Sequence, residues 1–79
     1  MNMDPGTWAA SFASVVRAEM AARRLTVAAL AVVLGVTEPT VRKRLSGEVA
    51  FDLVEVERMA RWLDTTPSAL LTRAGEQVG

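Results

Sequence analysis

The stretch Leu25–Gly47 decides the fold and reads Leu-Thr-Val-Ala-Ala-Leu-Ala-Val-Val-Leu-Gly-Val-Thr-Glu-Pro-Thr-Val-Arg-Lys-Arg-Leu-Ser-Gly. Thr26 and Thr37 each precede a short helical run, where a side-chain oxygen can cap the first turn. Gly35 lies between the two runs and tolerates the left-handed conformation in which many helices end. The stretch therefore predicts two short helices joined by a tight turn.

Small and apolar residues stand where the two helices of such a pair must meet. Ala31 provides the small side chain required for a close crossing, and Val36 and Val41 fill the gap between the helices. Three leucines attach the pair to the rest of the core: Leu30, Leu34 and Leu45. The pattern predicts a helix-turn-helix unit over residues 26–47.

Helical patterns continue on both sides of this unit. Upstream, apolar residues recur every four positions: Trp8, Phe12, Val16 and Met20. They share one face of a long first helix that we expect to begin with Asp4 as its N-cap, with Thr7 as a competing cap. Downstream, Asp52 and Glu55 have the spacing of a capping box, and Thr66 before Pro67 opens a last helix. Because no alternating strand pattern occurs, the predicted fold is all-α with five helices.

A chain of 79 residues is short enough to form one domain. We expect that domain to span residues 1–79, with its ordered part over 7–74 and a frayed tail over 75–79. The apolar stripes predict one shared core: Phe12, Val16, Leu30, Ala31, Leu34, Val41, Leu45, Leu53, Val56, Ala60, Leu63 and Leu70.

The composition argues against several kinds of chemistry. The chain has no cysteine and no histidine, which excludes disulfides, Cys/His zinc sites, cysteine nucleophiles and histidine general bases. It also contains no glycine-rich phosphate loop and no pair of carboxylates on a predicted cleft. We expect no catalytic residue, no metal site and no cofactor, and the protein is not expected to be an enzyme.

The distribution of hydrophobic residues argues against a membrane protein. They make up 51% of the chain, but the uncharged stretch 25–37 is too short and too mixed for a bilayer, which needs about 20 apolar residues. Met1–Pro5 has no basic segment of the kind that begins a secretory signal. We expect a cytoplasmic protein.

Charge is distributed unevenly, although the net charge is zero. Residues 17–46 carry six basic side chains against two acidic ones, whereas residues 47–79 carry three basic against six acidic. The middle of the chain is therefore basic, and its basic run Arg42-Lys43-Arg44 falls on the second helix of the helix-turn-helix unit.

Leu25–Gly47, with Arg17-Ala18-Glu19-Met20 before it and Phe51-Asp52 and Trp62-Leu63-Asp64 after it, resembles the XRE family. This family comprises the lambda-repressor-like and Cro-like DNA-binding domains, and the resemblance covers roughly residues 12–72. It is strongest to short regulators of actinobacteria and their phages. The resemblance implies a sequence-specific transcriptional regulator of the phage Cro or repressor type, whose third helix enters the major groove of double-stranded DNA.

The resemblance also assigns contacts position by position. It places base contacts on the face of the third helix: Glu38, Pro39, Arg42 and Lys43. It places phosphate contacts at Thr26, Thr37, Thr40 and Ser46, and the ambiguous Arg44 can reach a phosphate while its stem packs along the core edge. Residues 38, 39, 42 and 43 share one side of a helix, which agrees with this assignment.

The expected partners are operator DNA and a second copy of the chain. A single module of this size buries little DNA surface, so we expect a homodimer on a pseudo-palindromic operator and association with the nucleoid. Two alternatives remain: a helical protein-binding module, such as an antitoxin or host modulator, and an excision-type architectural protein that bends DNA. Zero net charge, and Val27 where the family commonly has glutamine, keep the protein-binding alternative open.

Overall fold

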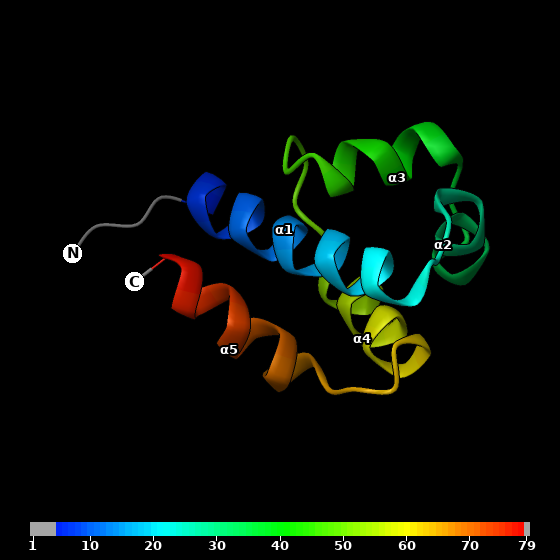
Figure 1. The fold of residues 1–79 in the computed structure, drawn as a ribbon. Helices are drawn as coiled ribbons and strands as arrows, with labels where there is room; N and C mark the ends of the chain where they lie inside the picture. Colours follow the sequence, from blue (N-terminus) through cyan, green and yellow to red (C-terminus); the bar gives the residue numbers. More distant parts are fainter. Residues whose placement is uncertain (1–4, 79) are drawn as a thin grey trace.

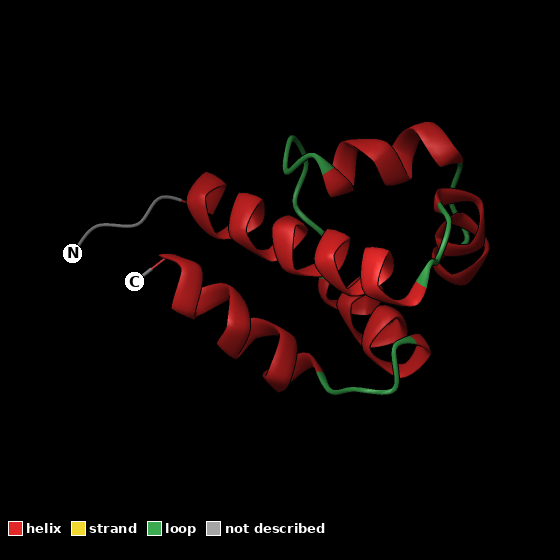
Figure 2. Ribbon diagram, in the orientation of Figure 1, coloured by secondary structure: helices red, strands yellow, loops and turns green. Residues whose placement is uncertain are grey.

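The computed structural model describes residues 5–78, which form five helices and no strand (Figures 1 and 2). The helices are α1 (Pro5–Arg23), α2 (Val27–Leu34), α3 (Glu38–Leu45), α4 (Leu53–Trp62) and α5 (Pro67–Val78). The prediction of an all-α, five-helix fold is confirmed. The predicted N-cap at Asp4 lies outside the described residues.

The helices pack in two groups that share one core. α1 and α5 lie side by side and run in opposite directions, while α2 packs against both α3 and α4 (Figure 1). α3 also contacts α1, so the helix-turn-helix unit is attached to the long first helix. This arrangement holds α3 at one edge of the molecule, with one of its faces turned to solvent (Figure 1).

Short polar side chains start the helices at the predicted positions. The Thr26 hydroxyl accepts a hydrogen bond from the Ala29 backbone N–H at 3.1 Å. The Thr37 hydroxyl accepts a hydrogen bond from the Thr40 backbone N–H at 3.4 Å. Gly35 ends α2 with φ +69°, the left-handed conformation expected for it. The tight turn of the helix-turn-helix unit therefore follows from signals that lie within a few residues of each other.

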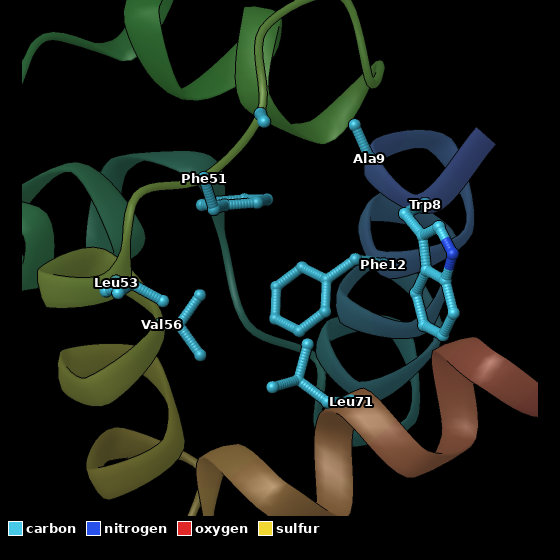
Figure 3. Close-up of a pocket in the computed structure, with 8 residues that line it drawn as sticks. Trp8, Ala9, Phe12, Phe51, Leu53, Val56 and Leu71 are labelled. Atoms are coloured by element: carbon cyan, nitrogen blue, oxygen red, sulfur yellow. The ribbon is translucent and has the colours of Figure 1, made fainter. Parts of the chain in front are cut away.

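The predicted core is confirmed at every position except Leu53. Leu53 is 83% exposed, although it shares a helical face with the buried Ala60. It is the first residue of α4, nearly two turns before Ala60, and it lies at the edge of an open apolar groove rather than inside the core (Figure 3). Five further residues complete the core: Ala13, Val15, Met20, Met59 and Ala74.

The last helix is longer than the sequence predicts. α5 continues to Val78, so residues 75–78 are helical where we expected a frayed tail. Ala74 is fully buried, and a Cβ added at Gly75 would meet the Trp8 ring at 3.0 Å. This packing against α1 overrides the low helix propensity of glycine. Within residues 5–78, no helix combines the length and apolar character needed to span a membrane.

Candidate nucleic-acid interface

The exposed face of α3 is formed by the four residues that the sequence analysis places there: Glu38, Pro39, Arg42 and Lys43. Val41 and Leu45 point the other way and are buried in the core. The alternation follows from the helical period, since buried and exposed pairs lie on opposite sides of the helix. A short helix anchored by two apolar side chains thus presents four others to a partner.

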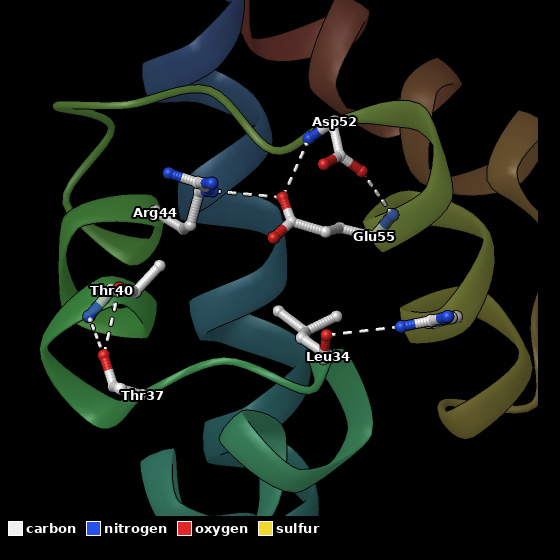
Figure 4. A network of polar contacts seen from close by, with 7 residues as sticks. Leu34, Thr37, Thr40, Arg44, Asp52 and Glu55 are labelled. Atoms are coloured by element: carbon white, nitrogen blue, oxygen red, sulfur yellow. Dashed lines mark hydrogen bonds and ion pairs between the residues drawn. The ribbon is translucent and has the colours of Figure 1, made fainter.

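The N-terminal ends of α2 and α3 both carry exposed threonines. The Thr26 and Thr37 hydroxyls each accept a backbone N–H group, and the Thr26 hydroxyl proton stays available to donate outwards. The Thr37 and Thr40 hydroxyls share one proton between them, so one of the two keeps a proton to donate. The Thr40 hydroxyl lies 3.0 Å from that of Thr37 (Figure 4). The N-terminus of a helix favours negative charge, so hydroxyls placed there suit contact with a phosphate.

The two basic residues on the exposed face of α3 differ in their surroundings. Arg42 forms an exposed ion pair with Glu38, one turn earlier, at 3.5 Å. Lys43 is exposed, and its side-chain ammonium has no hydrogen-bond or ion-pair partner among residues 5–78. Lys43 is therefore the cation on this face that a ligand can engage without first breaking an internal contact.

Ser46 lies at the C-terminal end of α3, where its hydroxyl stabilises the turn. Its hydroxyl donates to the Lys43 carbonyl at 3.0 Å and accepts from the Glu48 N–H at 3.2 Å. Both hydrogen-bonding functions are used locally. A phosphate would compete with the Lys43 carbonyl for the hydroxyl proton.

Arg44 connects α3 to the start of α4. Its Nε donates to Glu55 Oε1 at 3.0 Å, and Glu55 is only 5% exposed (Figure 4). The same oxygen accepts the Asp52 N–H at 2.9 Å, while the Glu55 N–H donates to Asp52 Oδ1 at 2.7 Å. The predicted capping box is confirmed. The link to Arg44 is not predictable from local spacing, because it joins two helices across 11 residues, and the spacing of acidic residues suggests a solvated face for Glu55 rather than burial.

Three more arginines donate to carbonyl oxygens at the C-terminal ends of helices, where backbone acceptors lack helical partners. The pairs are Arg17 with Leu45, Arg23 with Leu63 and Arg58 with Leu34. None of these three hydrogen bonds could be predicted from local sequence, because the partners lie 24 to 40 residues apart. These guanidinium groups hold the helices together and are partly withdrawn from any polyanionic ligand.

A fourth arginine lies in an ion pair between α1 and α5. Arg73 of α5 donates to Glu19 of α1, which also pairs with Arg23 at 3.2 Å. The hydrogen bond from Arg73 and the two positive charges lower the pKa of the Glu19 carboxyl, and partial burial opposes this effect. Among the described residues, only Lys43 and Arg24 are cations without a polar partner.

Comparison with known families adds one finding to this geometry. A family model described as a helix-turn-helix domain matches residues 11–73. The matched range contains all five helices in whole or in part, and it includes the entire exposed face of α3. Neither the curated proteins nor the solved structures contain a match to this chain.

Proposed function

The chain belongs to the helix-turn-helix domain family, in its XRE-like group, and from this premise we propose that it is a sequence-specific regulator that binds double-stranded DNA. One observation carries the proposal. α3 is anchored by Val41 and Leu45 and turns four side chains outwards from one face. A helix of this kind fits the major groove, where each base pair presents its own pattern of donors and acceptors.

Each exposed residue of α3 has a role that suits its chemistry. Lys43 and Arg42 can donate to guanine O6 and N7. Glu38 can accept from the cytosine amino group, and Pro39 can contact a thymine methyl. Arg42 would have to exchange its ion pair with Glu38 for a base, whereas Lys43 has no such contact to lose. We therefore assign the strongest base contact to Lys43.

The proposed phosphate contacts surround this face: Thr26, Thr37, Thr40, Arg44 and Ser46. Thr26 keeps a hydroxyl proton that can be donated to a phosphate at a helix N-terminus, and so does the one of Thr37 and Thr40 that accepts in the hydrogen bond between them. Arg44 uses its Nε for Glu55, so its terminal amino groups are the ones that would reach a phosphate. These contacts would set the register of the protein on the duplex without reading sequence.

We further propose that two copies bind together to a pseudo-palindromic operator. With zero net charge and few unpaired cations, one copy has little non-specific attraction to DNA. Two half-sites about 34 Å apart would double the contacts and match a two-fold dimer. The resemblance to Cro-like and repressor-like domains supports action by occupation of the operator.

Selection of bound duplexes from a random pool tests the proposal. We expect enrichment of one motif in two inverted copies, centred about 10 base pairs apart. Its affinity should fall only modestly with salt, because a slope of about −0.9 in a log–log plot comes from each phosphate neutralised by Lys or Arg, and Arg44 is the one cation among the proposed phosphate contacts. A pool that shows no enrichment at any salt concentration would contradict sequence-specific binding.

Several arginine side chains bind partners within the fold. This favours a second candidate function, that of a module that binds another protein. Arg17, Arg58 and Arg73 are engaged within the molecule, which leaves a small basic face for DNA. Retention on DNA separates the two functions. A DNA-binding regulator loses affinity in a linear log–log dependence on salt, whereas a module dedicated to protein binding is not retained.

A further inference from the structure

Arg44 of α3 and Glu55 of α4 form the least exposed ion pair in the described part of the chain, with side chains 19% and 7% exposed. The Glu55 oxygen that accepts the Arg44 Nε–H at 3.0 Å also accepts the Asp52 N–H at 2.9 Å (Figure 4). We propose that Glu55 is a positioning residue for DNA binding. It holds Arg44 at Nε and so fixes the terminal amino groups of the guanidinium for donation to a phosphate.

The inference rests on the proposed function, and stability alone gives a weak reason for charges at these two positions. Taking two charges out of water costs free energy that their mutual attraction only partly returns. Apolar side chains of similar volume often join two helices equally well or better. Donation to an anion is a role that the charged pair has and an apolar contact lacks.

The guanidinium group is suited to bind Glu55 and a phosphate at the same time. It carries five N–H groups in one plane, and Glu55 accepts the one at Nε. The four N–H groups of the two terminal nitrogens have no partner within residues 5–78. Figure 4 shows one of these nitrogens on the side opposite Glu55. The contact with Glu55 therefore leaves the donors that a phosphate needs.

Arg44 lies on the same side of α3 as two of the proposed phosphate contacts. Thr37, Thr40 and Arg44 follow each other at intervals of three and four residues, which aligns them along a helix (Figure 4). This row borders the exposed face of α3. It would follow the phosphates of one strand while the exposed face reads the bases.

Glu55 contributes to affinity by ordering Arg44 before DNA arrives. A mobile arginine loses rotamer freedom when it binds a phosphate. Ordering one such side chain at an interface lowers affinity by about two- to twelvefold. Because the pair with Glu55 already fixes Arg44 in the free protein, this loss is avoided on binding.

The sign of the effect separates positioning from simple electrostatics. Glu55 is negative, so a carboxylate that only repelled DNA would, when removed, leave an affinity higher than that of the parent. A positioning residue gives the opposite result. The matched control is Glu57 on the same helix, which is 68% exposed and pairs with Arg61 rather than Arg44.

Titration of the selected operator duplex with the full-length variants tests the proposal, at a temperature where circular dichroism shows each to be folded. Glu55→Ala should bind about two- to twelvefold more weakly than the parent. Glu57→Ala removes the same charge and should bind at least as tightly as the parent. Glu55→Gln keeps an oxygen for both the Arg44 and Asp52 N–H groups and should bind like the parent.

A double-mutant cycle separates positioning from a general effect on the fold. In the Arg44→Ala background, Glu55→Ala should no longer lower the affinity, because nothing remains to be positioned. An effect on the fold alone would lower the affinity by the same factor in both backgrounds. If Glu55→Ala does not fold, Arg44→Lys replaces it, since lysine keeps the charge but lacks the fork of donors and should lose a similar factor.

Salt dependence provides a second readout. Arg44→Ala removes a cation from a phosphate and should make the log–log slope shallower by about 0.9. Glu55→Ala leaves the charge of Arg44 in place, so it should lower the affinity while keeping the slope of the parent.

Equal affinities of Glu55→Ala and Glu57→Ala would overturn the inference, and so would equal losses in both backgrounds of the cycle. If the parent enriches a motif and Glu55→Ala binds it as the parent does, the DNA-binding function stands and only the role of Glu55 falls. If the parent enriches no motif, the DNA-binding function falls and takes this inference with it.

Discussion

At the residue scale, Gly47 sets how closely the end of α3 approaches α1. Its φ is +81°, and a Cβ added there would lie 2.9 Å from the Ala10 Cα. Gly35 also has a positive φ, but its nearest heavy atom is a flexible Arg58 nitrogen at 3.8 Å. We expect Gly47→Ala to lower the free energy of unfolding by about 1–3 kcal/mol through backbone strain alone, and further through the clash. Gly35→Ala should show the backbone strain without the clash. Equal losses in the free energy of unfolding for the two variants, measured by urea titration, would show that the contact of Gly47 with Ala10 adds nothing.

Lys43 allows a test of base contact against phosphate contact. If it binds a guanine, Lys43→Ala should cost about 1–3 kcal/mol on the selected site and much less on a scrambled duplex. Ser46→Ala should weaken binding to both duplexes alike, because phosphate contacts carry no sequence information. Titrations of both variants at two salt concentrations measure the difference. If Lys43→Ala lowers the affinity for both duplexes equally and makes the salt dependence shallower, Lys43 contacts a phosphate rather than a base.

Among the residues of α3, some environments could be predicted from the sequence and one could not. The exposed and buried positions of α3 follow from the helical period, and this is why Glu38 and Val41 lie on the expected sides. The environment of Arg44 does not follow from it. The run Arg42-Lys43-Arg44 looks uniform in sequence, yet Arg44 is largely buried against Glu55 while Lys43 points to solvent. Only packing against α4 separates the two.

At the scale of the elements, the Arg44–Glu55 pair joins α3 to α4. Glu55→Ala removes the partner of a largely buried guanidinium and half of the capping box. We expect it to lower the free energy of unfolding by about 1–3 kcal/mol. The matched control is Glu57→Ala, which breaks an exposed ion pair with Arg61 on the same helix and should cost at most about 0.5 kcal/mol. Thermal or urea unfolding of the two variants gives the comparison, and losses of equal size would show that the connection between α3 and α4 contributes nothing.

Helix boundaries in this chain could largely be predicted, because the signals are local. Thr26, Thr37, Asp52 and Thr66 each cap a backbone N–H three residues later. Contacts between helices were predicted less well. The arginine contacts with distant carbonyls depend on where the chain returns in space, which no short window of sequence contains.

At the scale of the whole molecule, Glu19 links the two long helices through Arg73 and makes stability depend on pH. The hydrogen bond from Arg73 and the nearby charges lower the pKa of Glu19 below its ordinary value of 4.5. The ion pair therefore stabilises the fold fully above pH 4.5, and this stabilisation is lost as the pH falls through the lower pKa of the folded state.

Glu19→Gln should accordingly be less stable than the parent at pH 7, with a difference that shrinks below pH 4.5. Urea unfolding at pH 7, 5 and 3 measures it. Glu57→Gln serves as the control, since its ion pair with Arg61 is exposed. A Glu19→Gln deficit that stays constant down to pH 3 would mean that the carboxyl charge is not what joins α1 to α5.

The shape of the whole molecule was the least predictable level. Helical periodicity places Leu53 on the core face, but it does not show that this side chain stays 83% exposed at the edge of a groove. The extended end of α5 packs against Trp8, which lies at the other end of the chain. Both differences from expectation lie around the same groove, where the chain leaves apolar surface uncovered.

The arginines whose guanidinium groups donate to helix carbonyls affect how this protein would search a chromosome. Sliding along random DNA depends on many cations that exchange one phosphate for the next. Here Arg17 and Arg58 are held by helix carbonyls, so an encounter with a wrong site should be brief. Target search would then proceed by repeated collisions from solution, at an unsteered association rate of about 10⁵–10⁶ M⁻¹s⁻¹. That rate should not increase when the operator is placed in a longer piece of DNA.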